Sequence, residues 1–188
     1  VAVLSLTSGR RRAAGVSGLG MIRSARLADM KHLLDDRVPR VRAAAILALA
    51  DADLLSAEEA WTAFVDDARS VSRAACVVFA EHPALAPEAD ALLGVSGDER
   101  PHVVANSLRV VLGLPRWTAL RGVLLATLPE NARPLVHARL QDWLRKEQLG
   151  FIAPTTSEWA AADAARRRAQ LPATLDKEVG AVLERWRP

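Results

Sequence analysis

The residues of this sequence that could do chemistry begin with two pairs of adjacent aspartates, Asp35–Asp36 and Asp66–Asp67. Two carboxylates side by side could share a proton in general acid–base catalysis or bind a divalent cation. Neighbouring side chains in a turn usually point in different directions, however, and no histidine accompanies either pair. We therefore expect both pairs to be structural, with no catalytic residue among them.

The sequence also contains four histidines, which could in principle bind a transition metal: His32, His82, His102 and His137. Glu81 stands directly before His82, which we interpret as a helix-end residue, because a cation suits the negative end of the helix dipole. No Cys/His cluster has zinc spacing, and there is no glycine-rich phosphate loop or nucleophile elbow. We expect a non-catalytic protein that binds no metal and no cofactor.

The cysteine count and the lengths of the apolar runs predict a protein without an intramolecular disulfide and without a membrane-spanning segment. The one cysteine, Cys76, lies in the apolar stretch AACVVFA, which indicates a small buried side chain rather than a reactive thiol. No apolar run approaches the roughly 18 residues needed to cross a bilayer. We expect a cytoplasmic protein with no membrane partner.

The elements that position these residues repeat along the chain. Residues of one type recur at steps of 31 in two series, Asp36, Asp67 and Asp98, and Ile46, Val77 and Leu108. A fixed period of this length is typical of stacked structural repeats. Helix-forming Ala and Leu abound, while the β-branched and aromatic enrichment of strands is missing, so the repeats are predicted to be helical.

Each repeat is predicted to hold two helices joined by the turn that carries the aspartate. The first helices are predicted at 24–34, 56–65 and 87–94, and the second at 39–50, 70–81 and 101–112. Pro39 and Pro101 fit the first turn of a helix, where the missing N–H costs nothing. The predicted fold class is all-α, built from antiparallel helix pairs.

The second helices resemble those of HEAT and HEAT-like (PBS-lyase-type) repeats, in which an aspartate is followed after four residues by Val-Arg, small residues and a leucine. The best copy matches this pattern at Asp36, Val41, Arg42, Ala45, Ala48 and Leu49. Later copies depart from it, with Ser72 where valine is expected and Val104 where arginine is expected. The resemblance covers about residues 10–145. It implies an α-solenoid (superhelix) of about four repeats, with units near 1–20, 24–50, 56–81, 87–112 and 116–145.

In this family the turn aspartate and the helix arginine are taken to form a ladder between neighbouring repeats. Carried over to this chain, the resemblance implies a structural ladder of Asp36, Arg42, Asp67, Arg73 and Asp98. The di-iron hydroxylases with HEAT-like repeats carry paired His-Glu motifs, whereas this chain has only the reversed Glu81-His82. The resemblance therefore gives no support to a metal site.

The repeat pattern stops after Gly150. Thr155 and Glu158 have the spacing of a capping box at a helix start, and helices are predicted at 157–170 and 175–186. We expect residues 1–150 to form the repeat solenoid and residues 151–188 to be a linker with C-terminal helices that cap it.

The resemblance also implies a concave surface lined by the second helices, on which such proteins bind extended partners. The repeat register predicts its exposed residues to be Arg37, Arg40, Leu47, Val78, Glu99, His102, Asn106, Arg109, Arg133 and Arg139. Mixed charge with apolar spots such as Leu47 and Val78 suits a protein or peptide with an acidic component. We expect a protein-interaction scaffold.

Two alternatives remain open. The arginines could contact phosphates, as in the HEAT-like DNA-alkylation repair glycosylases, although the formal net charge is only +3 and most cations are arginine, as is common in GC-rich bacterial genomes. The chain could instead be a regulatory segment of a larger enzyme, which its start at Val1 without a methionine would allow.

Overall fold

Helices, joined by turns and short loops, are the regular secondary structure of the residues that the structure describes. The computed structural model describes residues 8–21, 25–147 and 152–188, and no strand occurs among them. Within these residues no helix is long and apolar enough to span a membrane. The all-α fold class predicted from the sequence is confirmed. Contacts divide the chain into two compact units, Val1–Pro87 and Glu88–Pro188, called here the first and the second unit.

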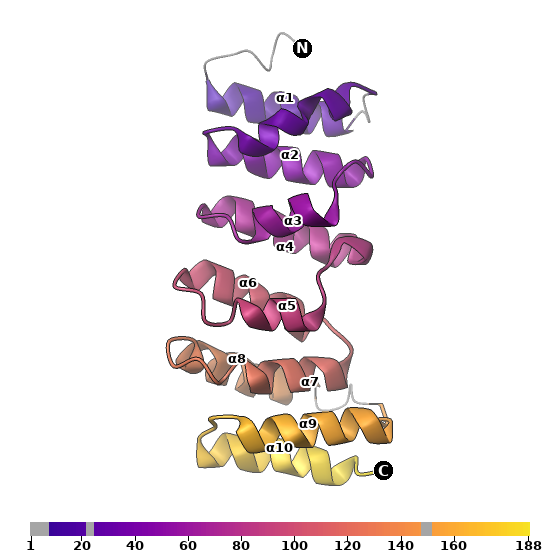
Figure 1. The fold of residues 1–188 in the computed structure, drawn as a ribbon, viewed down its shortest axis with the longest axis vertical. Helices are drawn as coiled ribbons and strands as arrows, with labels where there is room; N and C mark the ends of the chain where they lie inside the picture. Colours follow the sequence, from indigo (N-terminus) through magenta and orange to yellow (C-terminus); the bar gives the residue numbers. More distant parts are fainter. Residues whose placement is uncertain (1–7, 22–24, 148–151) are drawn as a thin grey trace. The chain divides into compact units, whose positions relative to one another are not determined.

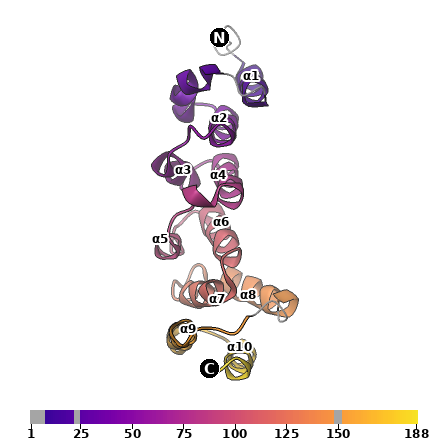
Figure 2. The same cartoon turned by 90° about the vertical axis from the view of Figure 1, so that its right-hand side faces the viewer.

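The first unit is built from helix pairs. Its elements are α1 (Gly9–Met21), the 3-10 helix η1 (Ala25–Asp35), α2 (Pro39–Asp51), α3 (Ala57–Phe64), α4 (Arg69–Glu81) and the short η2 (Pro83–Leu85). Helices α1, α2 and α4 lie beside one another in that order, and η1 and α3 pack on one side of them (Figure 1; Figure 2). The predicted second helices agree with α2 and α4 to within one residue. The predicted first helix at 24–34 is a 3-10 run over its described residues.

Aromatic and aliphatic side chains between the two layers form the core of the first unit. The Phe64 ring of α3 lies 5.3 Å from the Phe79 ring of α4 and 5.5 Å from the Trp61 ring, centroid to centroid. Met30 from η1 and Ile46 from α2 are also buried. Removing this apolar surface from water holds each first helix against the second helix of its pair.

The second unit continues the alternation of helices. Its elements are α5 (Ala89–Gly94), α6 (Pro101–Leu112), α7 (Arg116–Leu125), α8 (Arg133–Glu147), α9 (Thr156–Arg168) and α10 (Ala173–Arg185). Contacts run from α5 to α7 to α9 and from α6 to α8 to α10, which gives two layers, visible end-on in Figure 2. Helix α6 begins and ends at the predicted residues.

The C-terminal helices pack within the second unit. Helix α9 lies against α7, and α10 against α8 and α9. The predicted capping box is present, since the Thr155 hydroxyl accepts a hydrogen bond from the Glu158 N–H and the Glu158 carboxylate accepts one from the Thr155 N–H. Trp117 of α7 is buried, and its indole N–H donates to the Ile152 carbonyl oxygen at 2.7 Å. The segment after the repeats is therefore attached to α7 by side-chain contacts as well as by the chain.

Candidate functional site

The turns before the second helices show where the repeat register lies. Each turn aspartate accepts a hydrogen bond at Oδ1 from the backbone N–H two residues on, at 2.8 Å for Asp36, 2.7 Å for Asp66 and 2.8 Å for Asp98. The steps between these aspartates are 30 and 32 residues, not 31. The position that the sequence assigned to Asp67 belongs to Asp66, and Asp67 is exposed.

Arginine–aspartate pairs connect consecutive helix pairs of the first unit. Arg12 donates from Nε and Nη2 to the two carboxylate oxygens of Asp36, at 3.0 and 2.9 Å. Arg42 donates in the same way to Asp66, at 3.0 and 2.8 Å, and both pairs are separated by 24 residues. Two parallel N–H···O bonds to one carboxylate fix the geometry as well as the charge. Both pairs are largely shielded from solvent and connect the helix pairs of the first unit.

The residues that pair in the structure therefore differ from those predicted for the ladder. Arg73 is exposed, because Ser72 and not Arg73 stands 30 residues after Arg42. Asp98 pairs with Arg100 of its own turn, with Nη2 and Oδ2 2.7 Å apart. A one-residue change in the helix-pair length is enough to move an arginine from the helix interface to the surface, since one residue rotates a side chain by about 100° around the helix.

Hydrogen bonds favour the ionised form of two of the turn carboxylates, Asp36 and Asp98. Burial alone would raise the pKa of Asp36, but hydrogen bonds from Arg12 and from the Val38 N–H lower it below its ordinary value. The hydrogen bond from the Arg100 side chain lowers the pKa of Asp98 to about 2, against the opposing effect of burial. The lowered pKa values mean that both carboxylates stabilise the fold in their ionised form.

A cleft lies between η1 and α3 in the first unit and is called here the η1–α3 cleft. It has a volume of about 640 Å³, and Ile46 of α2 and Val71 of α4 contribute apolar lining. Lys31 of η1 donates to both carboxylate oxygens of Glu59 of α3, at 2.9 and 3.0 Å, which links the two walls. The serine and glutamate of a second capping box, Ser56 and Glu59, start α3 and orient that glutamate.

The lining of the η1–α3 cleft holds more carboxylates than cations. The Lys31–Glu59 and Arg42–Asp66 pairs each balance one positive with one negative charge. Asp35 and Glu58 add two exposed carboxylates, while His32 is the remaining basic group. With the histidine neutral, the cleft carries a formal excess of two negative charges in a protein whose formal net charge is +3.

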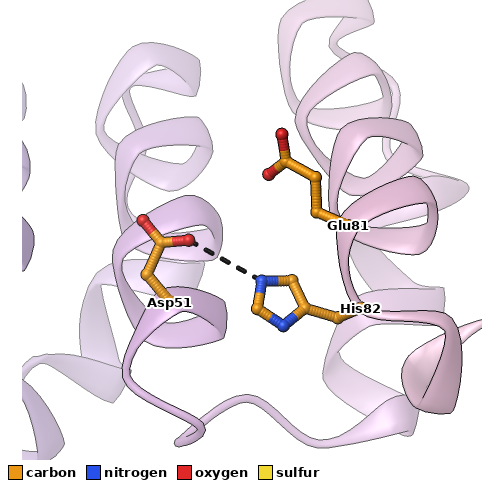
Figure 3. A group of neighbouring side chains, drawn as sticks. All are labelled: Asp51, Glu81 and His82. Atoms are coloured by element: carbon orange, nitrogen blue, oxygen red, sulfur yellow. Dashed lines mark ion pairs between the residues drawn. The ribbon is translucent and has the colours of Figure 1, made fainter.

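A third feature joins the C-terminal ends of α2 and α4. Figure 3 shows the side chains of Asp51, Glu81 and His82, with a dashed line between Asp51 and His82. One ligand atom from each residue lies within 4.8 Å of the others, and His82 Nε2 is 3.7 Å from Asp51 Oδ1. The sequence placed His82 at a helix end correctly, as the C-cap of α4. The proximity of Asp51 was missed, because it depends on the packing of α2 against α4.

The residues predicted to line a concave surface do not all reach the surface. Val78 is 1% exposed and Asn106 is 4% exposed, so both predictions were wrong. The register explains Val78, because the residue 30 positions after exposed Leu47 is half-buried Val77. Asn106 accepts a hydrogen bond from Arg109 at 2.7 Å, which holds the amide against α6.

The other predicted surface residues are accessible to different extents. Exposed positions are Arg37, Arg40, Leu47, Glu99, Arg109 and Arg139, while His102 and Arg133 are half-buried. Arg133 donates to the Thr127 carbonyl oxygen at 3.2 Å, which gives its guanidinium a role in the turn before α8. The predicted residues up to 87 belong to the first unit and the later ones to the second.

The η1–α3 cleft was not predicted. The sequence did hold one local indication of the α3 wall, because Ser56 and Glu59, three residues apart, have the spacing of a capping box at a helix start. Comparison of the chain with family models, curated proteins and solved structures found no match.

Proposed function

We propose that this chain is a non-catalytic binding protein built from HEAT-like repeats stacked as an α-solenoid, and that its η1–α3 cleft binds a basic segment of a protein or peptide partner. The observation that carries the proposal is the cleft of about 640 Å³ with two carboxylates in excess over cations. The sequence also predicted that a partner binds a concave surface lined by the second helices, and that prediction is separate from the cleft proposal.

Repeated contacts support the stacked architecture. The Arg12–Asp36 and Arg42–Asp66 pairs have the same atoms, the same bidentate geometry and the same separation of 24 residues. Helices α2 and α4 lie side by side, as second helices of stacked repeats would. Repeat proteins are stabilised in this way, because each unit buries its apolar face against the neighbouring unit.

The size and the charge of the cleft support a basic occupant. Its volume falls within the roughly 300–1,000 Å³ of ligand sites, which is room for a few side chains. Asp35 on η1 and Glu58 on α3 would each face an incoming guanidinium or ammonium group. Complementary charge gives specificity and speeds encounter more than it adds affinity, so the predicted complex is selective but weak for a single short peptide.

Fluorescence anisotropy with two labelled probes, hexa-arginine and hexa-glutamate peptides, tests the proposal. The full chain should prefer the arginine peptide, and the double variant Asp35→Asn/Glu58→Gln should weaken that binding roughly 5- to 30-fold, as expected for two exposed charge pairs of about 0.5–1 kcal/mol each. The preference is diagnostic, because the formal net charge of +3 would by itself favour the glutamate peptide.

A matched control separates the cleft from general electrostatics. Asp142→Asn/Glu130→Gln removes two exposed carboxylates from the second unit and changes the net charge equally. This variant should bind the arginine peptide like the unaltered protein. Preference for the glutamate peptide, or an equal loss in both double variants, would refute the cleft as the binding site.

A further inference from the structure

Asp51, Glu81 and His82 form a cluster of potential metal ligands at the C-terminal ends of α2 and α4. Asp51 is the last residue of α2, Glu81 is the last residue of α4, and His82 is the C-cap of α4. Since these two helices lie side by side and end at the same level, three side chains with metal-binding atoms meet at one edge of the first unit (Figure 3).

The electrostatics of this edge favour a cation. Each helix C-terminus carries a partial negative charge, equivalent to roughly half an elementary charge, from its unsatisfied carbonyl groups. Asp51 and Glu81 add two carboxylates to the negative ends of two helices. Acidic side chains are unfavourable at a helix C-terminus unless positive charge offsets them, and a protonated His82 would supply only one positive charge against these two carboxylates.

The contact between His82 and Asp51 leaves room for an ion. The 3.7 Å between Nε2 and Oδ1 exceeds the 2.7–3.2 Å of a protein N–H···O hydrogen bond. Two ligands on a tetrahedral ion with bonds of about 2.1 Å lie roughly 3.4 Å apart. The His82–Asp51 separation is thus closer to a pair of metal ligands than to a hydrogen bond, and a Glu81 oxygen lies within 4.8 Å of both ligand atoms.

We propose that Asp51, Glu81 and His82 form a binding site for one divalent transition-metal ion, with Zn²⁺ as the reference ion. An imidazole nitrogen with two carboxylate oxygens suits Zn²⁺, Co²⁺ or Ni²⁺ better than Mg²⁺ or Ca²⁺, which prefer oxygen ligands only. Three protein ligands leave a fourth position for water. The ion would tie the end of α2 to the end of α4 and so stabilise the first unit.

This site is independent of the proposed partner cleft. None of the three residues lines the η1–α3 cleft. Asp51 and Glu81 are exposed and His82 is half-buried, so an ion can reach the site from solvent. Cys76, the one thiol of the chain, is buried and does not belong to the cluster.

Isothermal titration of the full chain with Zn²⁺ tests the proposal, using protein that carries no histidine tag. The unaltered protein should bind one ion, and His82→Ala, Asp51→Asn and Glu81→Gln should each weaken binding at least about tenfold. The control is His137→Ala, which removes a half-buried histidine of the second unit that belongs to neither the cluster nor the η1–α3 cleft, and it should leave the affinity unchanged. A titration with Mg²⁺ should show far weaker binding than Zn²⁺.

A second measurement keeps the proposal testable if a variant is less stable. Zn²⁺ should raise the unfolding temperature of the unaltered protein and of His137→Ala, because an ion that binds only the folded state stabilises it. The same addition should not raise that of His82→Ala, whose folding is checked by circular dichroism. No Zn²⁺ binding by the unaltered protein, or equal Zn²⁺ affinity in His82→Ala, would overturn the assignment.

Discussion

The guanidinium of Arg42 joins two consecutive turns of the first unit, because it donates two hydrogen bonds to the Asp66 carboxylate and a third to the Asp36 carbonyl oxygen at 2.8 Å. Asp36 in turn holds Arg12 through its carboxylate. One aspartate thus contacts the arginine before it and the arginine after it by different oxygen atoms. A break at any point leaves a partly buried charge without its partner, which costs more than the pair contributes.

The first prediction concerns this chain of pairs. Arg42→Ala should lower the free energy of unfolding by about 1–3 kcal/mol, because it leaves the shielded Asp66 carboxylate and the Asp36 carbonyl group with fewer donors. Asp66→Ala should cost about as much. Urea unfolding followed by circular dichroism measures both.

The exposed neighbours of these residues are matched controls. Arg73→Ala and Asp67→Ala alter the residues that the sequence placed in the ladder, and both side chains are exposed. Each should change the unfolding free energy by less than about 1 kcal/mol. A larger loss for Asp67→Ala than for Asp66→Ala would restore the 31-residue register.

The sequence was sufficient to predict the helices but not their exact alignment. Patterns of apolar residues, Pro39, Pro101 and the turn aspartates place the second helices to within one residue. Two adjacent aspartates, Asp66 and Asp67, are chemically equivalent in sequence, so only the three-dimensional contact with Arg42 selects between them. That one-residue ambiguity is what put Val78 on the surface in the prediction.

The second prediction concerns the packing of α1 on α2. A Cβ atom added at Gly20 would lie 2.8 Å from the Ala48 Cβ and 3.2 Å from its Cα, whereas one added at Gly18 meets nothing within 4 Å. Gly20→Ala should therefore destabilise the protein by about 1–3 kcal/mol through overpacking. Gly18→Ala, in the same helix, should stabilise it by about 0.5–1 kcal/mol through helix propensity. Paired thermal and urea unfolding curves would distinguish the two, and equal effects would mean that α1 is not seated on Ala48.

The third prediction concerns acid stability. The pKa of Asp98 falls from an ordinary 3.8 to about 2 in the folded protein, and those of Asp36 and Asp176 are also lowered. A lowered pKa in the folded state means that the ionised form stabilises folding. The contribution of Asp98, about 1–2 kcal/mol after allowance for solvent screening, should be complete above about pH 5 and be lost as the pH falls through 3.8 towards 2.

The variant Asp98→Asn isolates this contribution, because its side-chain oxygen can still accept from the Arg100 N–H while the charge is lost. Urea unfolding of both proteins between about pH 2 and 7 should show a constant difference above about pH 5 and a vanishing one near pH 2. Identical acid dependence of the two proteins would mean that the Arg100 contact does not stabilise the fold.

The η1–α3 cleft and the Asp51 cluster could not be predicted from the sequence, for a physical reason. The η1–α3 cleft and the Asp51 cluster each combine residues from different helix pairs, and their separations of about 30 residues carry no local pattern. Local signals such as the Thr155 capping box are readable because both partners lie within one helical turn. Trp117 shows the same limit, since the acceptor of its indole N–H, the Ile152 carbonyl oxygen, lies 35 residues away.

The last prediction concerns the attachment of the C-terminal helices. The Thr127 hydroxyl is buried, donates to the Leu124 carbonyl oxygen at 2.7 Å and accepts from the Gln170 N–H at 2.9 Å, across 43 residues. Thr127→Val keeps the shape but removes both bonds, so it should lower the unfolding free energy by about 1–2 kcal/mol and speed hydrogen exchange at the Gln170 amide. Thr118→Val is the control on α7, where the half-buried threonine should tolerate the change with less than about 0.5 kcal/mol. Unchanged exchange at Gln170 in Thr127→Val would show that apolar packing of α9 on α7 holds these helices without the hydroxyl.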